Sequence, residues 1–149
     1  MRVEQELLSR AALMAFRLNG QFLALAEELA RPAGCTAARW QVLGAVLTEP
    51  LTVSGIARAM GITRQSVQRL ADVLVDEGLA EYVENPAHAR AKLVRPTEAG
   101  YAVIARIGPA HAAAADRLTT ELGRDALHDT IEAMSELSAA LDRLVPSRR

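Results

Sequence analysis

The sequence predicts a mostly α-helical fold with one small β-hairpin. Half of the 149 residues are hydrophobic but only 3% are aromatic, so small and aliphatic side chains must form the core, and helices let such side chains pack closely. Apolar residues recur at helical spacing in long segments near both ends of the chain, whereas only two short runs resemble strands. A chain of this length builds one compact core or a small domain with long dimerising helices.

Four helices are expected before residue 78. The first covers about residues 3–30, where leucines form an apolar stripe, and Pro32 and Gly34 end it. The next three are expected at about residues 36–49, 56–60 and 63–77. Each follows a hydroxyl side chain that can accept a hydrogen bond from the first backbone N–H groups of the helix: Thr36, then Thr52 or Ser54, then Thr63.

Two short strands and two long helices are expected in the rest of the chain. Residues 79–84 and 92–95 resemble strands, and the loop NPAHARA between them is rich in turn formers, so they predict a wing-like hairpin. A fifth helix starts at Thr97 and continues to about residue 119, although Gly108 and Pro109 should kink or divide it. A sixth covers residues 122–144. The expected organisation is an N-terminal dimerisation helix (1–34), a central domain (35–100) and C-terminal dimerisation helices (101–149).

The run SGIARAMGITRQSVQRL, residues 54–70, has a helix-turn-helix pattern. Such a motif needs a small residue where its two helices cross, here Ala57, and a residue that tolerates positive φ in the turn, here Gly61. Apolar residues at the expected intervals face a shared core: Ile56, Met60, Ile62, Val67 and Leu70. The pattern favours DNA binding. The alternative is two ordinary amphipathic helices joined by a glycine turn.

The distribution of charge supports DNA binding although the total does not. The net charge is −1 and the pI is near 6.3, whereas phosphate neutralisation needs a basic surface. However, every charged residue in 51–70 and in 85–96 is basic, and the acidic residues lie between these segments, from Asp72 to Glu84. The acidic segment is therefore expected to point away from DNA, and the fourth helix to enter the major groove N-terminus first.

Candidate DNA contacts come from three places: the residues expected to cap the third and fourth helices, the first turns of the fourth helix, and the hairpin. Their side chains suit base edges and phosphates, and an arginine at a hairpin tip can enter a narrow minor groove. The alternative for the hairpin is a loop charged for solubility. The candidates are Thr52, Ser54, Thr63, Arg64, Gln65, Ser66, Gln68, Arg69, His88, Arg90 and Lys92.

The segment from Thr36 to Gly100 resembles the DNA-binding core of the MarR family of bacterial transcription regulators. The resemblance is carried by TRQSVQRL, followed by the predicted wing and TEAG. It implies a winged helix-turn-helix, an obligate homodimer, a pseudo-palindromic operator, and release by a small ligand or by oxidation. By family position the recognition contacts are Arg64, Gln65, Ser66, Gln68 and Arg69, with Arg90 in the wing. Many members have an aspartate two residues before that arginine. Here it is His88, so Arg90 is expected to be less rigidly held, or His88 itself to touch phosphate.

Dimerisation is also expected from the terminal helices themselves. The apolar stripes of the first and sixth helices are long for the ends of a small domain and must be buried against something. A two-fold partner is the simplest solution. Two recognition helices would then meet an inverted repeat whose half-sites are centred about 10 bp apart or a multiple of that.

The signal that the protein senses is open at this stage. The resemblance implies a ligand pocket between the dimer helices and the DNA-binding lobe, and its expected lining is Phe16, Phe22, Arg39 and Trp40. Core packing is the alternative, particularly for Trp40. Cys35, the single cysteine, excludes an intrachain disulfide and precedes a helix whose dipole could activate it, so redox sensing is an alternative to a buried, incidental thiol.

Several function classes fit the sequence poorly. The three histidines do not have the i, i+4 spacing of a helical metal-ligand pair, no catalytic constellation is visible, and no cofactor is expected. No signal peptide or membrane span is visible, so a cytoplasmic location is expected. The expected function is a sequence-specific regulator, more specifically a repressor. The rival is a winged-helix dimerisation or partner module that no longer binds specific DNA.

Overall fold

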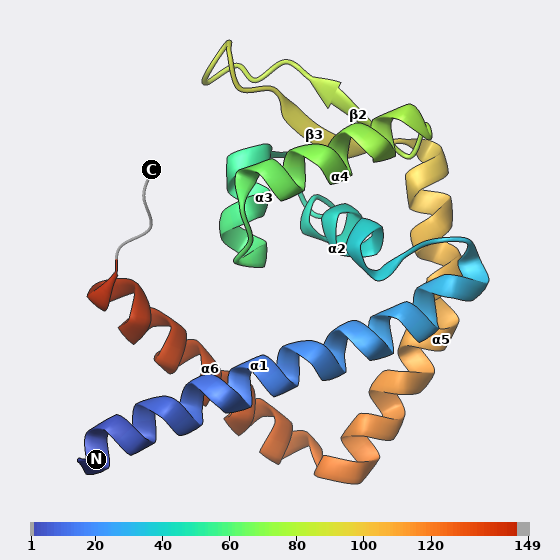
Figure 1. Cartoon of the computed structure of the whole chain (residues 1–149). Helices are drawn as coiled ribbons and strands as arrows, with labels where there is room; N and C mark the ends of the chain where they lie inside the picture. Colours follow the sequence, from blue (N-terminus) through green and yellow to red (C-terminus); the bar gives the residue numbers. More distant parts are fainter. Residues whose placement is uncertain (1, 146–149) are drawn as a thin grey trace. The chain divides into compact units, whose positions relative to one another are not determined.

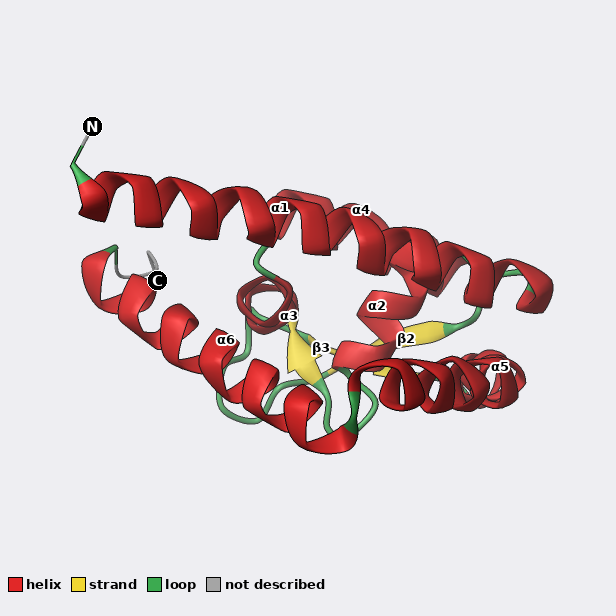
Figure 2. Cartoon of the chain, turned by 90° about the horizontal axis from the view of Figure 1, so that it is seen from below, coloured by secondary structure: helices red, strands yellow, loops and turns green. Residues whose placement is uncertain are grey.

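The computed structural model describes residues 2–145, and helices make up most of them (Figures 1 and 2). The last four residues of the predicted C-terminal dimerisation segment and the first residue of the N-terminal one lie outside the described residues. In chain order the elements are α1 (Val3–Ala30), the 3-10 helix η1 (Arg31–Ala33), α2 (Ala37–Ala45), β1 (Leu51–Thr52), α3 (Val53–Met60), α4 (Arg64–Asp76), β2 (Ala80–Val83), β3 (Leu93–Pro96), α5 (Glu98–Leu122) and α6 (Arg124–Leu144). The predicted mostly α fold with a small hairpin is therefore confirmed.

Threonine side chains begin three of the helices, as the sequence predicts. The Oγ1 atom of Thr36 accepts a hydrogen bond from the backbone N of Arg39 at 3.2 Å, and the Oγ1 of Thr63 accepts one from the N of Ser66 at 3.1 Å. Thr52, rather than Ser54, caps α3. The third helix therefore begins at Val53, three residues before the predicted start, because the cap stands earlier in the chain.

The sequence predicts that Gly108 and Pro109 kink or divide the fifth helix, and of these two outcomes the division is wrong. Helix α5 continues through both residues to Leu122. Proline removes one backbone hydrogen bond, the one that would reach the carbonyl of Ala105 four residues earlier. Ala105 is exposed, so water can solvate this carbonyl and the helix tolerates the loss. The chain nonetheless forms two compact units that meet here, one ending at Ile107 and the other beginning at Gly108.

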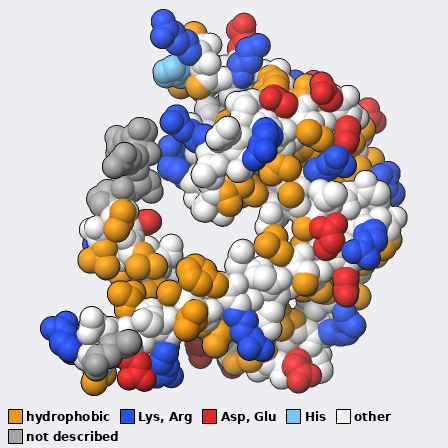
Figure 3. Space-filling model, viewed as in Figure 1, with side chains coloured by type: hydrophobic (Ala, Val, Ile, Leu, Met, Phe, Trp, Pro, Cys, Tyr) orange, Lys and Arg blue, Asp and Glu red, His pale blue; other side chains and the backbone are white. Residues whose placement is uncertain are grey.

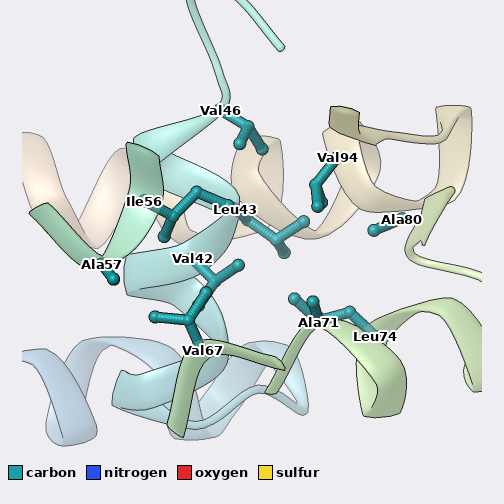
Figure 4. Packing of buried hydrophobic residues seen from close by; sticks show 10 residues of the cluster. All are labelled: Val42, Leu43, Val46, Ile56, Ala57, Val67, Ala71, Leu74, Ala80 and Val94. Atoms are coloured by element: carbon teal, nitrogen blue, oxygen red, sulfur yellow. The ribbon is translucent and has the colours of Figure 1, made fainter. Parts of the chain in front are cut away.

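The core of the first unit lies under the helix-turn-helix. Residues from α2, α3, α4 and both hairpin strands converge on it, with their side chains pointing toward one another (Figure 4). Its buried members are Val42, Leu43, Val46, Ile56, Ala57, Val67, Ala71, Leu74, Ala80 and Val94. The close packing of these aliphatic side chains fixes the orientation of α4. A second cluster joins the end of α1 to α5 through Ala30, Cys35, Val103 and Ile107.

A three-stranded antiparallel sheet of order β1-β3-β2 forms the wing. Tyr82 on β2 and Leu51 on β1 both pair with Val94 on β3, which is buried. The strand β1 has two residues and was not predicted, because a run this short has no alternation to detect. It pairs the start of α3 with the wing, so the wing and the helix-turn-helix form one body.

A close backbone contact attaches the wing to α5. The backbone N of Thr97 donates to the carbonyl of Leu79 at 3.1 Å, and its Oγ1 donates to the carbonyl of Gly78 at 2.6 Å. Gly100 is buried against the same segment, and a Cβ added to it would lie 2.1 Å from the Leu79 oxygen. Only glycine allows α5 to approach this closely.

The first and last helices, α1 and α6, leave large apolar side chains uncovered in the single chain. On α1 these are Val3, Leu7, Leu8, Leu13, Met14, Phe16 and Phe22, and on α6 they are Ile131, Met134, Leu137, Leu141 and Leu144. Figure 3 shows such side chains in orange along α6. Within the described part of the chain, no helix is long and apolar enough to span a membrane.

Candidate nucleic-acid interface

Helix α4 presents one buried face and one exposed face. Val67, Ala71 and Leu74 are buried in the core, and at about 100° per residue Gln65 and Arg69 point in the opposite direction. Both are exposed. The outer face of this helix is therefore the one that the sequence predicts for DNA contact.

A groove of about 610 Å³ lies between α4, the start of α3 and the wing. It brings together seven of the eleven candidate residues: Thr52, Ser54, Arg64, Gln65, Gln68, Arg90 and Lys92. Val53, Tyr82 and Ala91 complete its lining. Among the described residues that line the groove, three are cationic and none is acidic, so its potential suits a phosphate backbone.

Two of the remaining candidates line a second hollow, and Thr63 lies at the start of α4. Ser66 and Arg69 line a second hollow of about 380 Å³ with Leu70 and Val73, on the other flank of α4. The hydroxyl of Thr63 caps α4 and also donates to the Oγ of Ser66 at 2.9 Å. Thr63 therefore has a structural role at the start of the helix.

Two hydrogen bonds to Asn85 hold the first part of the wing loop. The side-chain Oδ1 of Asn85 accepts from the N of Ala87 at 3.0 Å, and the backbone O of Asn85 accepts from the N of His88 at 3.1 Å. His88 and Arg90 are exposed. In the part of the chain that the structure describes, no hydrogen bond or ion pair joins the side chains of these two residues. Figure 3 shows basic side chains at the tip of the wing, at the top of the view, with an acidic one beside them.

Ion pairs occupy two acidic residues of the segment between the basic stretches. Glu81 pairs with Arg95 across the two wing strands, with 2.6 Å between Oε1 and Nε. Glu77, just after α4, pairs with Arg39 of α2 at 3.0 Å. Arg95 is thus engaged in the wing, and it does not line the groove.

Tyr82 lines the groove but was not predicted from the sequence. Its hydroxyl donates to Oδ1 of Asp72 and accepts from Nε2 of Gln68, which lies 3.0 Å away. Partial burial and the hydrogen bond to Asp72 raise the pKa of Tyr82 above its ordinary value. The only available signal was an aromatic residue on a predicted strand, which does not reveal its partners on α4.

The four expected ligand-lining residues lie in different surroundings. Phe16 and Phe22 are exposed on α1, with 72% of Phe16 accessible. Arg39 forms the ion pair with Glu77, and Trp40 packs against the cluster that contains Cys35. The structure of the single chain therefore does not gather them around one cavity.

Cys35 lies in an environment that disfavours its thiolate. Only 6% of the residue is exposed, and its Sγ donates to the carbonyl of Thr36 at 3.4 Å. Burial raises the pKa of the Cys35 thiol, whereas redox-active cysteines usually have a lowered pKa and are accessible. This environment fits the buried, incidental thiol better than the redox sensor.

Comparisons with known proteins find relatives that match most of the length of this chain. The profile of the MarR family matches residues 33–91. An uncharacterized protein of Mycobacterium tuberculosis is 37% identical over 134 residues, which cover 90% of this chain and 94% of that protein. The crystal structure of a MarR family transcription regulator, SP03579, is similar with a TM-score of 0.73 and 24% identity, over 94% of this chain and 95% of that one. The transcriptional repressor CouR, bound to a 23-mer DNA duplex, gives a TM-score of 0.70 and 26% identity, over 86% and 94% of the two chains.

Proposed function

The chain belongs to the MarR family of transcription regulators, which are not enzymes, and we propose that it is a repressor that binds a pseudo-palindromic operator as a homodimer. One observation carries the proposal. The groove between α4, the start of α3 and the wing is lined by Arg64, Arg90 and Lys92 and by polar side chains. Cations that neutralise phosphates beside polar groups that can reach bases are what specific DNA binding requires.

The proposed docking places α4 in the major groove with its N-terminal end deepest. Gln65 and Arg69 on the outer face would contact bases or phosphates in the first turns. Asp76 lies at the far end of the helix. In this docking that end is the farthest from the DNA, so the phosphates repel the Asp76 carboxylate less. Arg90 on the exposed wing loop would reach the neighbouring minor groove.

The homodimer is supported by the uncovered apolar side chains. Seven large ones on α1 and five on α6 are exposed in the single chain. Exposed apolar surface on this scale is typical of an interface. A two-fold arrangement would bury the same residues in both copies. It would also supply two α4 helices for two half-sites, centred about 10 bp apart or a multiple of that.

We also propose that a small-molecule effector releases the protein from its operator. Arg39 offers a guanidinium group that can pair with the carboxylate of an aromatic acid, and Trp40, one position later on α2, would sense the change. Arg39 also holds Glu77, just after α4, at 3.0 Å. A ligand that drew Arg39 away would therefore release a contact at the end of the recognition helix, and a coupling of about 1–3 kcal/mol would suffice to shift operator binding.

The decisive experiment for DNA binding is selection of bound duplexes from a random pool. The homodimer is tested separately, by measuring the molar mass with light scattering at micromolar concentration. We expect an inverted repeat and the mass of two chains. A monomeric mass would refute the homodimer. Failure to enrich any sequence would favour the partner-module alternative.

Two further measurements test the regulatory part of the proposal. Transcription in vitro from a promoter that overlaps the selected operator should fall when the protein is added, and a rise would identify an activator instead. Trp40 is the only tryptophan, so benzoate titrated against its fluorescence tests the effector site directly. No fluorescence change with benzoate, and operator binding unaffected by it, would remove Arg39 and Trp40 from the proposal.

A further inference from the structure

Three polar side chains join the recognition helix to the wing. Nε2 of Gln68 lies 3.0 Å from Oδ1 of Asp72, one turn later on α4, and 3.0 Å from the hydroxyl of Tyr82 on β2. The Tyr82 hydroxyl in turn donates to the same Asp72 oxygen. We call this closed triangle of Gln68, Asp72 and Tyr82 the latch.

The orientation of the Gln68 amide within the latch follows from chemistry. An ionised carboxylate only accepts hydrogen bonds, so the side of the amide that faces Asp72 must be the NH₂ group. The Tyr82 hydroxyl gives its single proton to Asp72 and therefore accepts from Gln68. Both partners lie 3.0 Å from the amide nitrogen, so the latch directs this nitrogen toward Asp72 and Tyr82, and the carbonyl oxygen is the part of the amide that it leaves unengaged.

This leaves Gln68 unable to make the contact for which glutamine is best suited. Two-point recognition of adenine uses the amide nitrogen as donor to N7 and the amide oxygen as acceptor from N6. With the nitrogen engaged, only the acceptor half remains. A single acceptor discriminates weakly, because every base pair presents one exocyclic amino group in the major groove.

We propose that Gln68 is not a base-reading residue in this protein, and that Asp72 and Tyr82 are positioning residues that use it to hold the wing against the recognition helix. The inference rests on the proposed function, since it assigns roles within the operator-binding surface. It also accounts for a carboxylate so near the groove, because Asp72 accepts two hydrogen bonds within the protein. The raised pKa of Tyr82 agrees with a phenol held by a carboxylate.

The first test compares selected operators. Duplexes are selected from the same random pool by the unaltered chain and by the variants Gln68→Ala, Tyr82→Phe and Tyr82→Phe/Gln68→Ala. The unaltered chain and Gln68→Ala should show the same adenine frequency at each position. Tyr82→Phe removes one of the two groups that hold the amide nitrogen, so it should gain adenine at one position of each half-site, and the double variant should lose this gain. Loss of an adenine preference in Gln68→Ala alone would overturn the proposal.

Affinity supplies a second readout with a matched control. Tyr82→Phe should weaken binding to the original operator by about 2–10-fold, because the wing loses its two hydrogen bonds to α4 while the pairing of β2 with β3 still holds it. Tyr101→Phe removes the same atom from an exposed tyrosine on α5 and should change neither affinity nor base preference. Equal behaviour of the two variants would contradict a positioning role for Tyr82.

A third measurement needs no DNA. The chain has two tyrosines, so in a Tyr101→Phe background the phenolate absorbance reports Tyr82 alone. Adding Asp72→Asn should move the ionisation of Tyr82 to lower pH, and an unchanged midpoint would show that the latch does not exist in solution. If the unaltered chain enriches no DNA, the proposed function and the base-reading part of the inference both fail, whereas this titration still decides whether the latch forms.

Discussion

Replacement of Gly100 by alanine tests how closely α5 must approach the wing. The added Cβ would lie 2.1 Å from the carbonyl oxygen of Leu79, 3.1 Å from its carbonyl carbon and 3.3 Å from Cβ of Pro96. The nearest of these atoms belongs to the backbone and cannot rotate away. The helix and the strand must therefore separate by more than 1 Å.

The expected cost follows from what that separation disrupts. Overpacking of a well-packed site costs about 1–3 kcal/mol. The two hydrogen bonds of Thr97 to Leu79 and Gly78 would lengthen or break, at about 0.5–1.5 kcal/mol each. Alanine returns up to ~1 kcal/mol through its better helix propensity. We expect Gly100→Ala to lower the free energy of unfolding by about 2–4 kcal/mol.

Chemical denaturation followed by circular dichroism, at one fixed protein concentration, measures this loss. The matched control is Gly44→Ala, because Gly44 is also helical, exposed, and has no atom within 4 Å of an added Cβ. The same chemical change should there leave stability unchanged or raise it by up to ~1 kcal/mol. Equal free energies of unfolding for the two variants would refute the close-approach argument.

The remaining predictions concern DNA contacts, the thiol and the phenol. Arg69→Ala and Arg90→Ala should each weaken operator binding by about 1–3 kcal/mol and reduce its salt dependence, as measured by fluorescence anisotropy. The dimer should stay intact, and Arg124→Ala at the start of α6 is the neutral control. Unchanged binding would remove Arg69 and Arg90 from the interface. Alkylation of Cys35 at pH 8 should be much slower in the folded chain than in urea, and equal rates would contradict its burial. Because the pKa of Tyr82 is raised in the folded chain, its protonated form stabilises the fold fully below pH ~10 and this contribution is lost at higher pH. Stability measured from pH 7 to 11 should therefore fall less steeply in Tyr82→Phe, and identical slopes would count against the shift.

The helix-turn-helix was predictable because its determinants are local. Helix starts could be predicted from three threonines, because each accepts a hydrogen bond from a backbone N only three residues later: Thr36, Thr52 and Thr63. Gly61 adopts the left-handed backbone expected for the turn, with φ of 67°. The apolar spacing then indicates which side of α4 faces the core, and so which side is exposed. These signals are confirmed because each depends on a short stretch of chain.

The rest depended on contacts between distant segments. Tyr82 on a strand gives no sign that it will meet Asp72 on a helix ten residues earlier, and the sequence therefore predicts Gln68 as a DNA contact. The continuity of α5 through Pro109 was not predictable, because the cost of the proline depends on whether the carbonyl that loses its partner is exposed. The expected ligand residues stay apart in the single chain. A pocket formed by two copies would depend on contacts between the chains, and the residue pattern of one chain does not reveal those contacts.

The uncovered apolar side chains of α1 and α6 also bear on what stability means for this protein. If they are buried against a second copy, folding and association become one equilibrium that follows the law of mass action. Each tenfold dilution would then lower the free energy that association contributes by about 1.4 kcal/mol. The melting temperature would then depend on the protein concentration as well as on the sequence. The abundance of the protein in the cell would set the fraction that is competent to bind DNA.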